Sequence, residues 1–134
     1  MQKAFFLLFA ALLAVSPLGC GGGTNLKEIS GQVTLDGQPI ESGSITFVPE
    51  GKGTAEGANL VGGKYTVSVS PGKLKVSISA TRPHPTEKVP DANPDAPMVP
   101  KMVQYIPAKY NEATELTITV EKGGSTHDFQ LKSN

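Results

Sequence analysis

Several residue types that mark common binding functions are scarce in this chain. There is no tryptophan, and the aromatic residues are three tyrosines and five phenylalanines, so flat side chains for stacking sugars or unpaired bases are few. Arginine occurs once, as Arg82, whereas recognition of phosphates and base edges usually takes several arginines. Lysine plus arginine and aspartate plus glutamate both total 12, which gives a formal net charge of zero. The composition therefore gives no electrostatic reason to expect nucleic acid as a partner.

Cysteine is equally scarce, and its one position is informative. Cys20 has no partner for an intrachain disulfide, and an unpaired thiol in an exported chain calls for an explanation. It follows an uninterrupted apolar run at residues 4–15, which Lys3 precedes. A helix needs about 20 apolar residues to cross a bilayer, whereas a shorter run behind a positive charge is typical of a signal peptide. We therefore interpret residues 1–19 as a signal peptide and expect the chain to be exported.

The residues around Cys20 resemble the bacterial lipobox, the motif at which a cysteine is acylated before the leader is cleaved. Leu18 and Gly19 stand directly before Cys20, although Pro17 occupies the place that the motif usually gives to leucine. The resemblance implies that Cys20 carries acyl chains, two or more of which anchor a protein stably to a membrane. Gly21 after the cysteine implies sorting to the outer membrane, facing the periplasm or the cell surface. An ordinary secretory signal with an unrelated cysteine is the alternative.

Glycine dominates the stretch that follows Cys20. Three consecutive glycines cannot pack a core, so we expect residues 20–27 to be a flexible tether. The folded domain is then expected at residues 28–134. A domain of that size can bury a core without disulfides.

Beyond the tether, apolar and polar residues alternate with the period of two that indicates β-strands. The clearest pair of strands flanks Pro71 and Gly72, a turn dipeptide in which proline fixes φ and glycine supplies a positive φ. One side of each strand is apolar, as in an antiparallel sheet with one buried face. The expected strands are residues 29–35, 44–48, 54–61, 65–70, 74–81, 116–121 and 129–131. This pattern predicts an all-β fold, an antiparallel sandwich of about seven strands with the size of an immunoglobulin-like or transthyretin-like domain.

One long segment departs from this alternation. Residues 82–113 contain seven of the 11 prolines, and long loops in compact domains are often functional or disordered. We expect the part up to Ala96 to be mobile or in polyproline II conformation. The part after it carries several large apolar side chains that should not all face water, so we expect it to lie against the sandwich.

Residues 63–78, with the sequence Gly-Lys-Tyr-Thr-Val-Ser-Val-Ser-Pro-Gly-Lys-Leu-Lys-Val-Ser-Ile, resemble the core motif of carboxypeptidase regulatory-like domains. These domains are transthyretin-like, or prealbumin-like, sandwiches. Residues 29–40 and 43–47 are similar to the first two strands of the family, and residues 106–111 resemble a stretch of small bacterial lipoproteins that carry this domain alone. The resemblance implies a generally non-catalytic domain, although a fold does not by itself fix a function.

The motifs of enzymes with related folds are incomplete in this sequence. Prealbumin-like intradiol dioxygenases hold iron with two tyrosines and two histidines, but the His-x-His pair of that family is absent here. The candidates would be Tyr65, Tyr105, Tyr110, His84 and His127. The tail of hydroxyisourate hydrolases and the Gly-x-Ser-x-Gly motif of serine hydrolases are also absent. We therefore expect that the protein is not an enzyme and that it binds no cofactor.

Metal ligands are few and dispersed. A zinc site takes three or four cysteine, histidine or carboxylate ligands, and His84 and His127 stand far apart in the sequence. Asp91 and Asp95 could contact Ca²⁺ together with loop carbonyls, although two acids in a proline-rich loop are more often simply solvated. We therefore expect no metal site.

The sequence favours a non-enzymatic, lipid-anchored envelope protein that acts as a binding or structural module. Its partners would be the membrane, through the lipid on Cys20, and an unidentified envelope protein or polysaccharide. The expected contact surface lies in the proline-rich segment, because that segment is long, apolar and outside the regular strands. Its residues are Met98, Met102, Tyr105, Ile106 and Tyr110. Three alternatives stay open: that this segment only covers a sheet edge or the end of the core, that the chain is a carbohydrate-binding module, and that it is an enzyme of unknown type.

Overall fold

The computed structural model describes residues 25–134. The signal peptide at residues 1–19, Cys20 and the first part of the tether lie outside the described residues. Within them the chain is almost entirely β-strand, with one 3-10 helix, η1 (Ala108–Tyr110). Across residues 25–134 no helix is long and apolar enough to cross a membrane.

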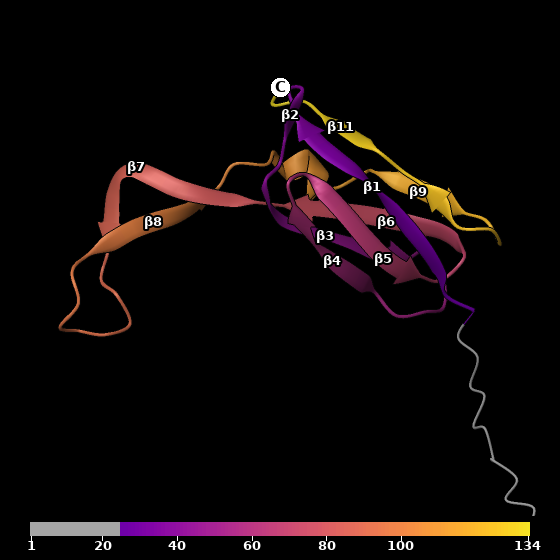
Figure 1. Ribbon diagram of the computed structural model, residues 1–134, viewed down its shortest axis with the longest axis horizontal. Helices are drawn as coiled ribbons and strands as arrows, with labels where there is room; N and C mark the ends of the chain where they lie inside the picture. The colour runs from indigo at the N-terminus through magenta and orange to yellow at the C-terminus, as the bar shows by residue number, and fades with distance from the viewer. Residues whose placement is uncertain (1–24) are drawn as a thin grey trace, which may run out of the picture.

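The strands form one strongly curved sheet and one separate two-stranded ribbon (Figure 1). In chain order they are β1 (Lys27–Leu35), β2 (Gln38–Pro39), β3 (Ser42–Pro49), β4 (Glu56–Val61), β5 (Lys64–Val69), β6 (Gly72–Ser79), β7 (Thr81–Val89), β8 (Val99–Gln104), β9 (Thr117–Val120), β10 (Ser125–Thr126) and β11 (Phe129–Leu131). The large sheet has the order β10-β1-β5-β4-β3-β6-β9, with β2 and β11 also paired to β1. Strands β4 and β5 pair only at Val61 and Lys64, where the hairpin turns. The sheet therefore opens into two facing halves, which confirms the predicted all-β sandwich.

Seven strands of the sandwich have three or more residues: β1, β3, β4, β5, β6, β9 and β11. All seven were predicted from the alternation pattern. The Asp36-Gly37 turn after β1 has φ angles of 51° and 84°, which is the left-handed geometry of a tight hairpin turn. Gly72 has a φ of 122°, so the Pro71-Gly72 turn also uses the glycine as predicted.

The final strands run parallel to the first, in an otherwise antiparallel sheet. Ile29 of β1 lies opposite Ser125 of β10, and Val33 lies opposite Phe129 of β11. Between β10 and β11 the chain crosses directly over Gly31, where a Cβ atom would stand only 1.9 Å from the His127 carbonyl oxygen. The end of the chain can pack on β1 because this position has no side chain.

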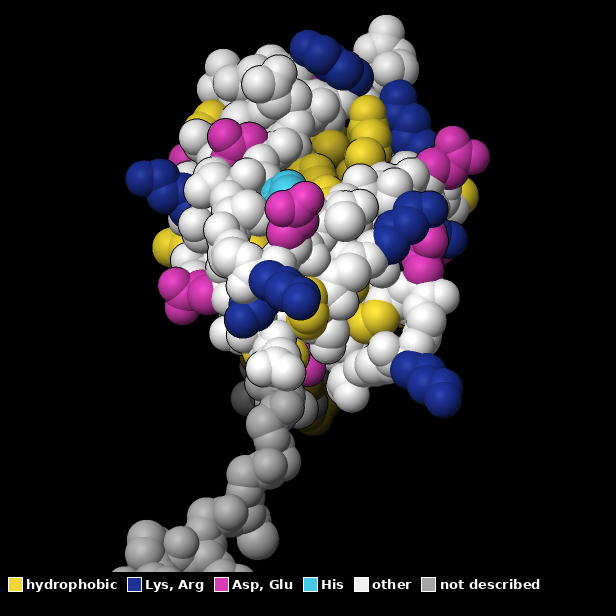
Figure 2. All heavy atoms as spheres, turned by 90° about the vertical axis from the view of Figure 1, so that its right-hand side faces the viewer, with side chains coloured by type: hydrophobic (Ala, Val, Ile, Leu, Met, Phe, Trp, Pro, Cys, Tyr) yellow, Lys and Arg dark blue, Asp and Glu magenta, His cyan; other side chains and the backbone are white. Residues whose placement is uncertain are grey.

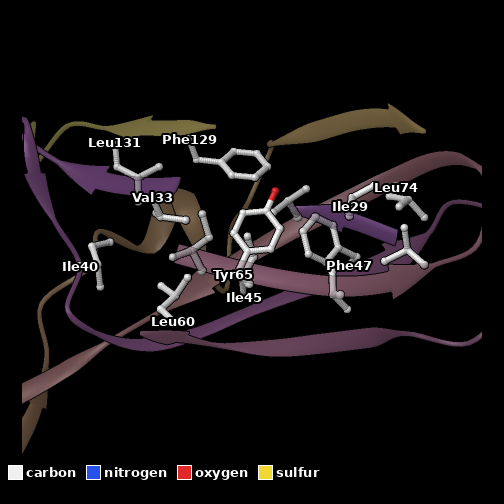
Figure 3. Close-up of a cluster of buried hydrophobic side chains, with 14 of the residues drawn as sticks. Ile29, Val33, Ile40, Ile45, Phe47, Leu60, Tyr65, Leu74, Phe129 and Leu131 are labelled. Atoms are coloured by element: carbon white, nitrogen blue, oxygen red, sulfur yellow. The ribbon is translucent and has the colours of Figure 1, made fainter. Parts of the chain in front are cut away.

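The core lies between the two halves of the sheet (Figure 3). Cross-strand register sets the apolar residues of neighbouring strands side by side, as with Ile45 and Ile78 or Phe47 and Val76. Burying each large aliphatic or aromatic side chain stabilises the fold by about 1.5–3 kcal/mol. The buried set is Ile29, Val33, Ile40, Ile45, Phe47, Leu60, Tyr65, Val67, Val69, Leu74, Val76, Ile78, Ala80, Ile106, Val120, Phe129 and Leu131.

The proline-rich segment is not the long loop that its composition predicts. Strands β7 and β8 form an antiparallel ribbon that projects from the sandwich (Figure 1). We call residues 81–104 the arm: β7, β8 and the connection between them. Proline lacks an N–H, so Pro83 and Pro100 can stand in this ladder with the imino nitrogen facing its outer edges. A two-stranded ribbon has two such edges, which is why it tolerates prolines that an inner strand would not.

Candidate functional site

The arm departs from regular pairing near its middle. Pro83 lies opposite Met102, and Lys88 lies opposite Pro100. Four residues of β7 therefore face the single residue Lys101 of β8, which makes a large β-bulge. Bulges bend and twist a ribbon locally and re-aim its side chains.

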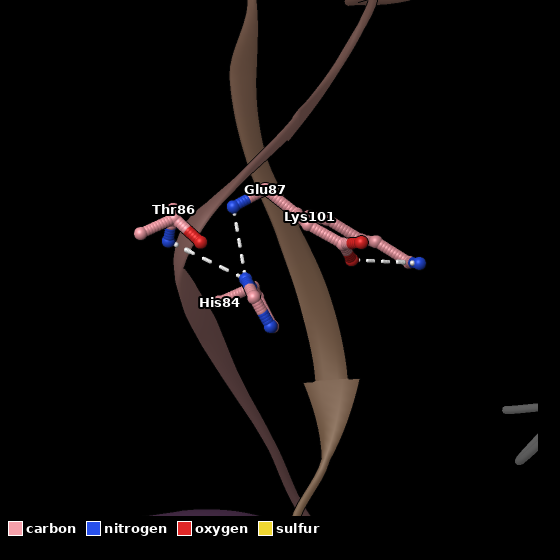
Figure 4. A network of polar contacts seen from close by, with 4 residues as sticks. All are labelled: His84, Thr86, Glu87 and Lys101. Carbon is pink, nitrogen blue, oxygen red and sulfur yellow. Dashed lines mark hydrogen bonds and ion pairs between the residues drawn. The ribbon is translucent and has the colours of Figure 1, made fainter.

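Polar contacts hold the shape of this bulge (Figure 4). The backbone N–H groups of Thr86 and Glu87 donate to His84 Nδ1 at 3.3 and 2.9 Å. Lys101 Nζ lies 2.9 Å from Glu87 Oε2 across the ribbon. His84 therefore has a structural role here, with Nδ1 as the acceptor nitrogen.

Large apolar side chains of the arm face solvent. Met98, Met102 and Val89 are 52, 55 and 37% exposed. Alternation along β8, with the pairing to Pro83, places Pro83, Pro100 and Met102 on one face of the ribbon. We call these three residues the apolar face of the arm, and Met98 directly precedes β8 at its outer end.

The five residues predicted as one contact surface are divided by the structure. Met98 and Met102 are exposed on the arm, and Tyr105 is half-buried where the arm leaves the sandwich. Ile106 is only 3% exposed and belongs to the core, so its assignment to a contact surface was wrong. Tyr110 packs against the same core, and its hydroxyl accepts a hydrogen bond of 3.1 Å from the Lys132 N–H. The expectation that the whole segment after Ala96 lies against the sandwich holds only from Tyr105 onward, because β8 pairs with β7 instead.

A groove lies at the root of the arm. Its lining includes the Arg82 guanidinium, which lies 5.3 Å from the centre of the Tyr105 ring, a distance typical of a cation–π contact. Arg82 makes no ion pair among the described residues. The groove has a volume of about 380 Å³ and is lined by Pro39, Glu41, Ser42, Thr81, Arg82, Pro83 and Tyr105. We call it the root groove; sequence reasoning missed it because its two sides come from different hairpins.

The tip of the arm, residues 90–98, carries the two aspartates considered for calcium. Asp91 Oδ1 accepts the Asn93 N–H at 2.9 Å, and Asn93 Oδ1 accepts the Asp95 N–H at 3.2 Å. These are successive Asx turns, which shape the tip by local hydrogen bonds. Within residues 25–134 no three histidine, cysteine, aspartate or glutamate side chains are grouped as metal ligands would be.

The candidate iron ligands are not brought together by the fold. His84 lies in the arm, and His127 lies between β10 and β11. The Tyr65 hydroxyl donates to the His127 backbone oxygen at 2.7 Å, so this tyrosine meets the backbone of the histidine and not its ring. Burial, with a smaller contribution from Asp128, raises the pKa of Tyr65 far above its usual value. Tyr65 is therefore a neutral core residue and a poor metal ligand.

One polar pair was not foreseen from the sequence. Ser125 Oγ lies 2.7 Å from His127 Nε2, and a Ser-x-His spacing on an extended segment is the signal that could have found it. A serine nucleophile also needs an orienting partner for its histidine and a donor site for the oxyanion. No hydrogen bond reaches His127 Nδ1 from the described residues, and nearby Asp128 Oδ1 instead accepts the Gln32 N–H at 2.8 Å. The pair is an exposed structural contact.

Exposed tyrosine rings are scarce among the described residues. Tyr65 is buried, and Tyr105 and Tyr110 are half-covered, each beneath a basic side chain. Figure 2 shows the end of the molecule that faces away from the arm, where basic side chains lie among aspartate and glutamate side chains. The charges of both signs are intermixed across this face.

The fold and the surface define an all-β sandwich with a projecting ribbon, and comparison with known proteins adds little to that. No family model matches the sequence, and no curated protein matches it. Among solved structures, the chain is distantly similar to the crystal structure of a 9R-lipoxygenase from Cyanothece PCC8801, with 13% identity and a TM-score of 0.37. The match covers 81% of this chain and 16% of the lipoxygenase chain.

Proposed function

We propose that the protein is a non-enzymatic, lipid-anchored binding module of the cell envelope, with the arm as its contact surface. The observation that carries this proposal is the arm itself. It pairs only with itself, stands outside the sandwich and exposes Met98 and Met102. Flexible, polarisable methionines are common at adaptable binding surfaces.

The geometry of the sandwich supports a membrane-distal role for the arm. Strand β1 begins at the end of the sandwich that lies away from the arm (Figure 1). An anchor on Cys20, joined through the glycine-rich residues to β1, would hold the sandwich as a spacer and direct the arm away from the lipid. The resemblance to carboxypeptidase regulatory-like domains, which are generally non-catalytic, agrees with this role.

The anchor is tested by intact mass spectrometry of the protein purified from its native membrane. The expected mass is that of a chain that begins at Cys20 and carries two or three acyl chains. A Cys20→Ala variant is the control, and it should leave the membrane fraction. An unmodified chain cleaved at another position would overturn the lipid anchor.

The contact role of the arm is tested by photo-cross-linking in intact cells with a benzophenone amino acid in place of Met102. The expected result is a discrete cross-linked protein band. The same probe at Lys52, in the loop between β3 and β4, is the matched control. Identical background from both positions would overturn the arm as a contact surface.

A further inference from the structure

The arm lacks the packing that normally stabilises a ribbon. An isolated two-stranded hairpin is marginally stable in water and gains independent stability from a third strand or a packed face. Nearly every residue of β7 and β8 is exposed or half-exposed, and neither strand pairs with the sandwich. A partner that packs along the arm would supply this missing stabilisation.

The edges of the arm indicate how such a partner would bind. Pro83 and Pro100 interrupt the row of outward N–H groups on the two edges, and Pro85 adds a further interruption in the bulge. Prolines on an edge oppose the addition of another strand. Contact through the faces and the tip of the arm is therefore favoured over extension of its ladder.

The two ends of the arm are chemically complementary. The root groove is lined by Arg82 and Glu41, and Tyr105, Pro39 and Pro83 also belong to its lining. The tip presents Asp91 and Asp95 in a segment that also contains Pro90, Pro94 and Pro97, with Lys88 beside it on β7. The tip thus matches the groove in both signs of charge.

We propose that two copies of this chain pair through their arms, running antiparallel, with the tip of each arm in the root groove of the other. In this arrangement Asp91 or Asp95 of one copy meets Arg82 of the other, and Lys88 meets Glu41. The two copies are identical, so each tip occupies the groove of the other copy in the same way. The two contacts are related by a two-fold axis, and the assembly closes as a dimer. This inference rests on the proposed role of the arm as the contact surface and names its partner.

The dimer is tested by analytical ultracentrifugation of the full acylated chain in a nonionic detergent. The wild-type protein is expected to form a dimer, with two chains in each protein–detergent complex. Arg82→Glu and the pair Asp91→Lys with Asp95→Lys should each weaken the dimer at least tenfold, because each places like charges in contact. The chain that combines all three changes should recover most of the wild-type dimer, since the charges are then complementary again. Lys122→Glu, remote from the arm, is the charge-matched control.

The same measurement separates this inference from the proposed function. A monomeric acylated chain, or a dimer that the arm variants leave unchanged, would overturn the pairing of arms while leaving the lipid anchor intact. Photo-cross-linking from Met102 to a protein of another mass would also overturn the second copy as partner, yet it would support the arm as a binding surface. Because Arg82, Asp95 and Lys122 are exposed, Asp91 is half-exposed and none of them belongs to the core, far-ultraviolet circular dichroism is expected to show an unchanged sandwich in every variant.

Discussion

Tyr65 joins the middle of the chain to its end through one side chain. Its hydroxyl donates to the His127 backbone oxygen, and its ring packs between Phe47 and Phe129 at centroid distances of 5.6 and 6.2 Å. The glycine-x-tyrosine pattern predicts a core tyrosine here, but not its hydrogen-bond partner. That partner depends on the path of β10 and β11, which local alternation does not specify.

Removing the Tyr65 hydroxyl separates its hydrogen bond from its packing. Tyr65→Phe should destabilise the fold by about 1 kcal/mol, the usual net contribution of one hydrogen bond. Tyr65→Ala should cost about 3–5 kcal/mol, because it also leaves a cavity between the two phenylalanines. Urea denaturation followed by circular dichroism measures both. Equal losses in the two variants would contradict the hydrogen bond as a separate contribution.

The raised pKa of Tyr65 predicts how stability responds to alkali. In the unfolded chain a tyrosine loses its proton near pH 10, whereas burial keeps Tyr65 neutral in the folded state well above that. Above pH 10 the unfolded state therefore binds fewer protons than the folded state. The free energy of unfolding keeps its full value below pH 10 and declines as the pH rises further. Tyr65→Phe should lose less stability between pH 9 and pH 11 than wild type does.

The contact between Asp36 and Ser133 is expected to respond to acid. Ser133, through its side chain and its backbone N–H, holds the pKa of this carboxyl below its ordinary value of 3.8, and the N–H lies 3.1 Å from Asp36 Oδ1. A depressed pKa means that the contact persists at neutral pH and is lost as the pH falls through the folded-state value. In an NMR titration the Ser133 amide should therefore shift below pH 3.8.

Substitution of Asp36 by asparagine provides the control for that titration. Asparagine tolerates the φ of 51° that this turn position adopts, so the hairpin should survive. The acid shift of the Ser133 amide should disappear, because the amide side chain does not titrate. A shift that persists in Asp36→Asn would place its origin elsewhere.

At the scale of elements, β1 is the strand on which the two ends of the domain meet. Its pairing with β5 on one side and with β10 and β11 on the other requires the close approach at Gly31. Gly31→Ala should destabilise the sandwich by about 1–3 kcal/mol, as overpacking typically does. Gly123→Ala, where a Cβ would meet nothing within 4 Å, is the matched control. Equal stability of the two variants in urea denaturation would contradict the crossing over Gly31.

The local pattern was sufficient for strands and insufficient for the arm. Alternation and turn dipeptides identified the seven long strands of the sandwich, since each signal lies within a few neighbouring residues. Seven prolines between residues 82 and 113 favoured a loop, and the bulge between Pro83 and Lys88 shifts the pairing register. The exposure of Met98 and Met102 could be predicted only by knowing that β8 pairs with β7. The burial of Ile106 follows from the return of the chain to the core after Gln104.

At the scale of the whole molecule, the arm and the sandwich share no strand pairing, so the sandwich should fold without the arm. We expect this of a chain in which residues 83–102 are replaced by Asn-Gly, so that Arg82 and Val103, which face each other in the ribbon, close a two-residue hairpin. The sandwich core contains no side chain from the excised residues, which is why little stability should be lost. Circular dichroism melting should give a transition within a few degrees of wild type. The dependence of the unfolding free energy on urea concentration should fall only in proportion to the missing surface.

A double variant is the control. The Tyr65→Phe substitution should lower the unfolding free energy of the excised chain by the same amount as that of the intact chain, because the effects of distant sites are additive. A collapsed transition in the excised chain would mean that the arm helps to form the sandwich, and the division of the molecule into a spacer and a contact arm would then be wrong.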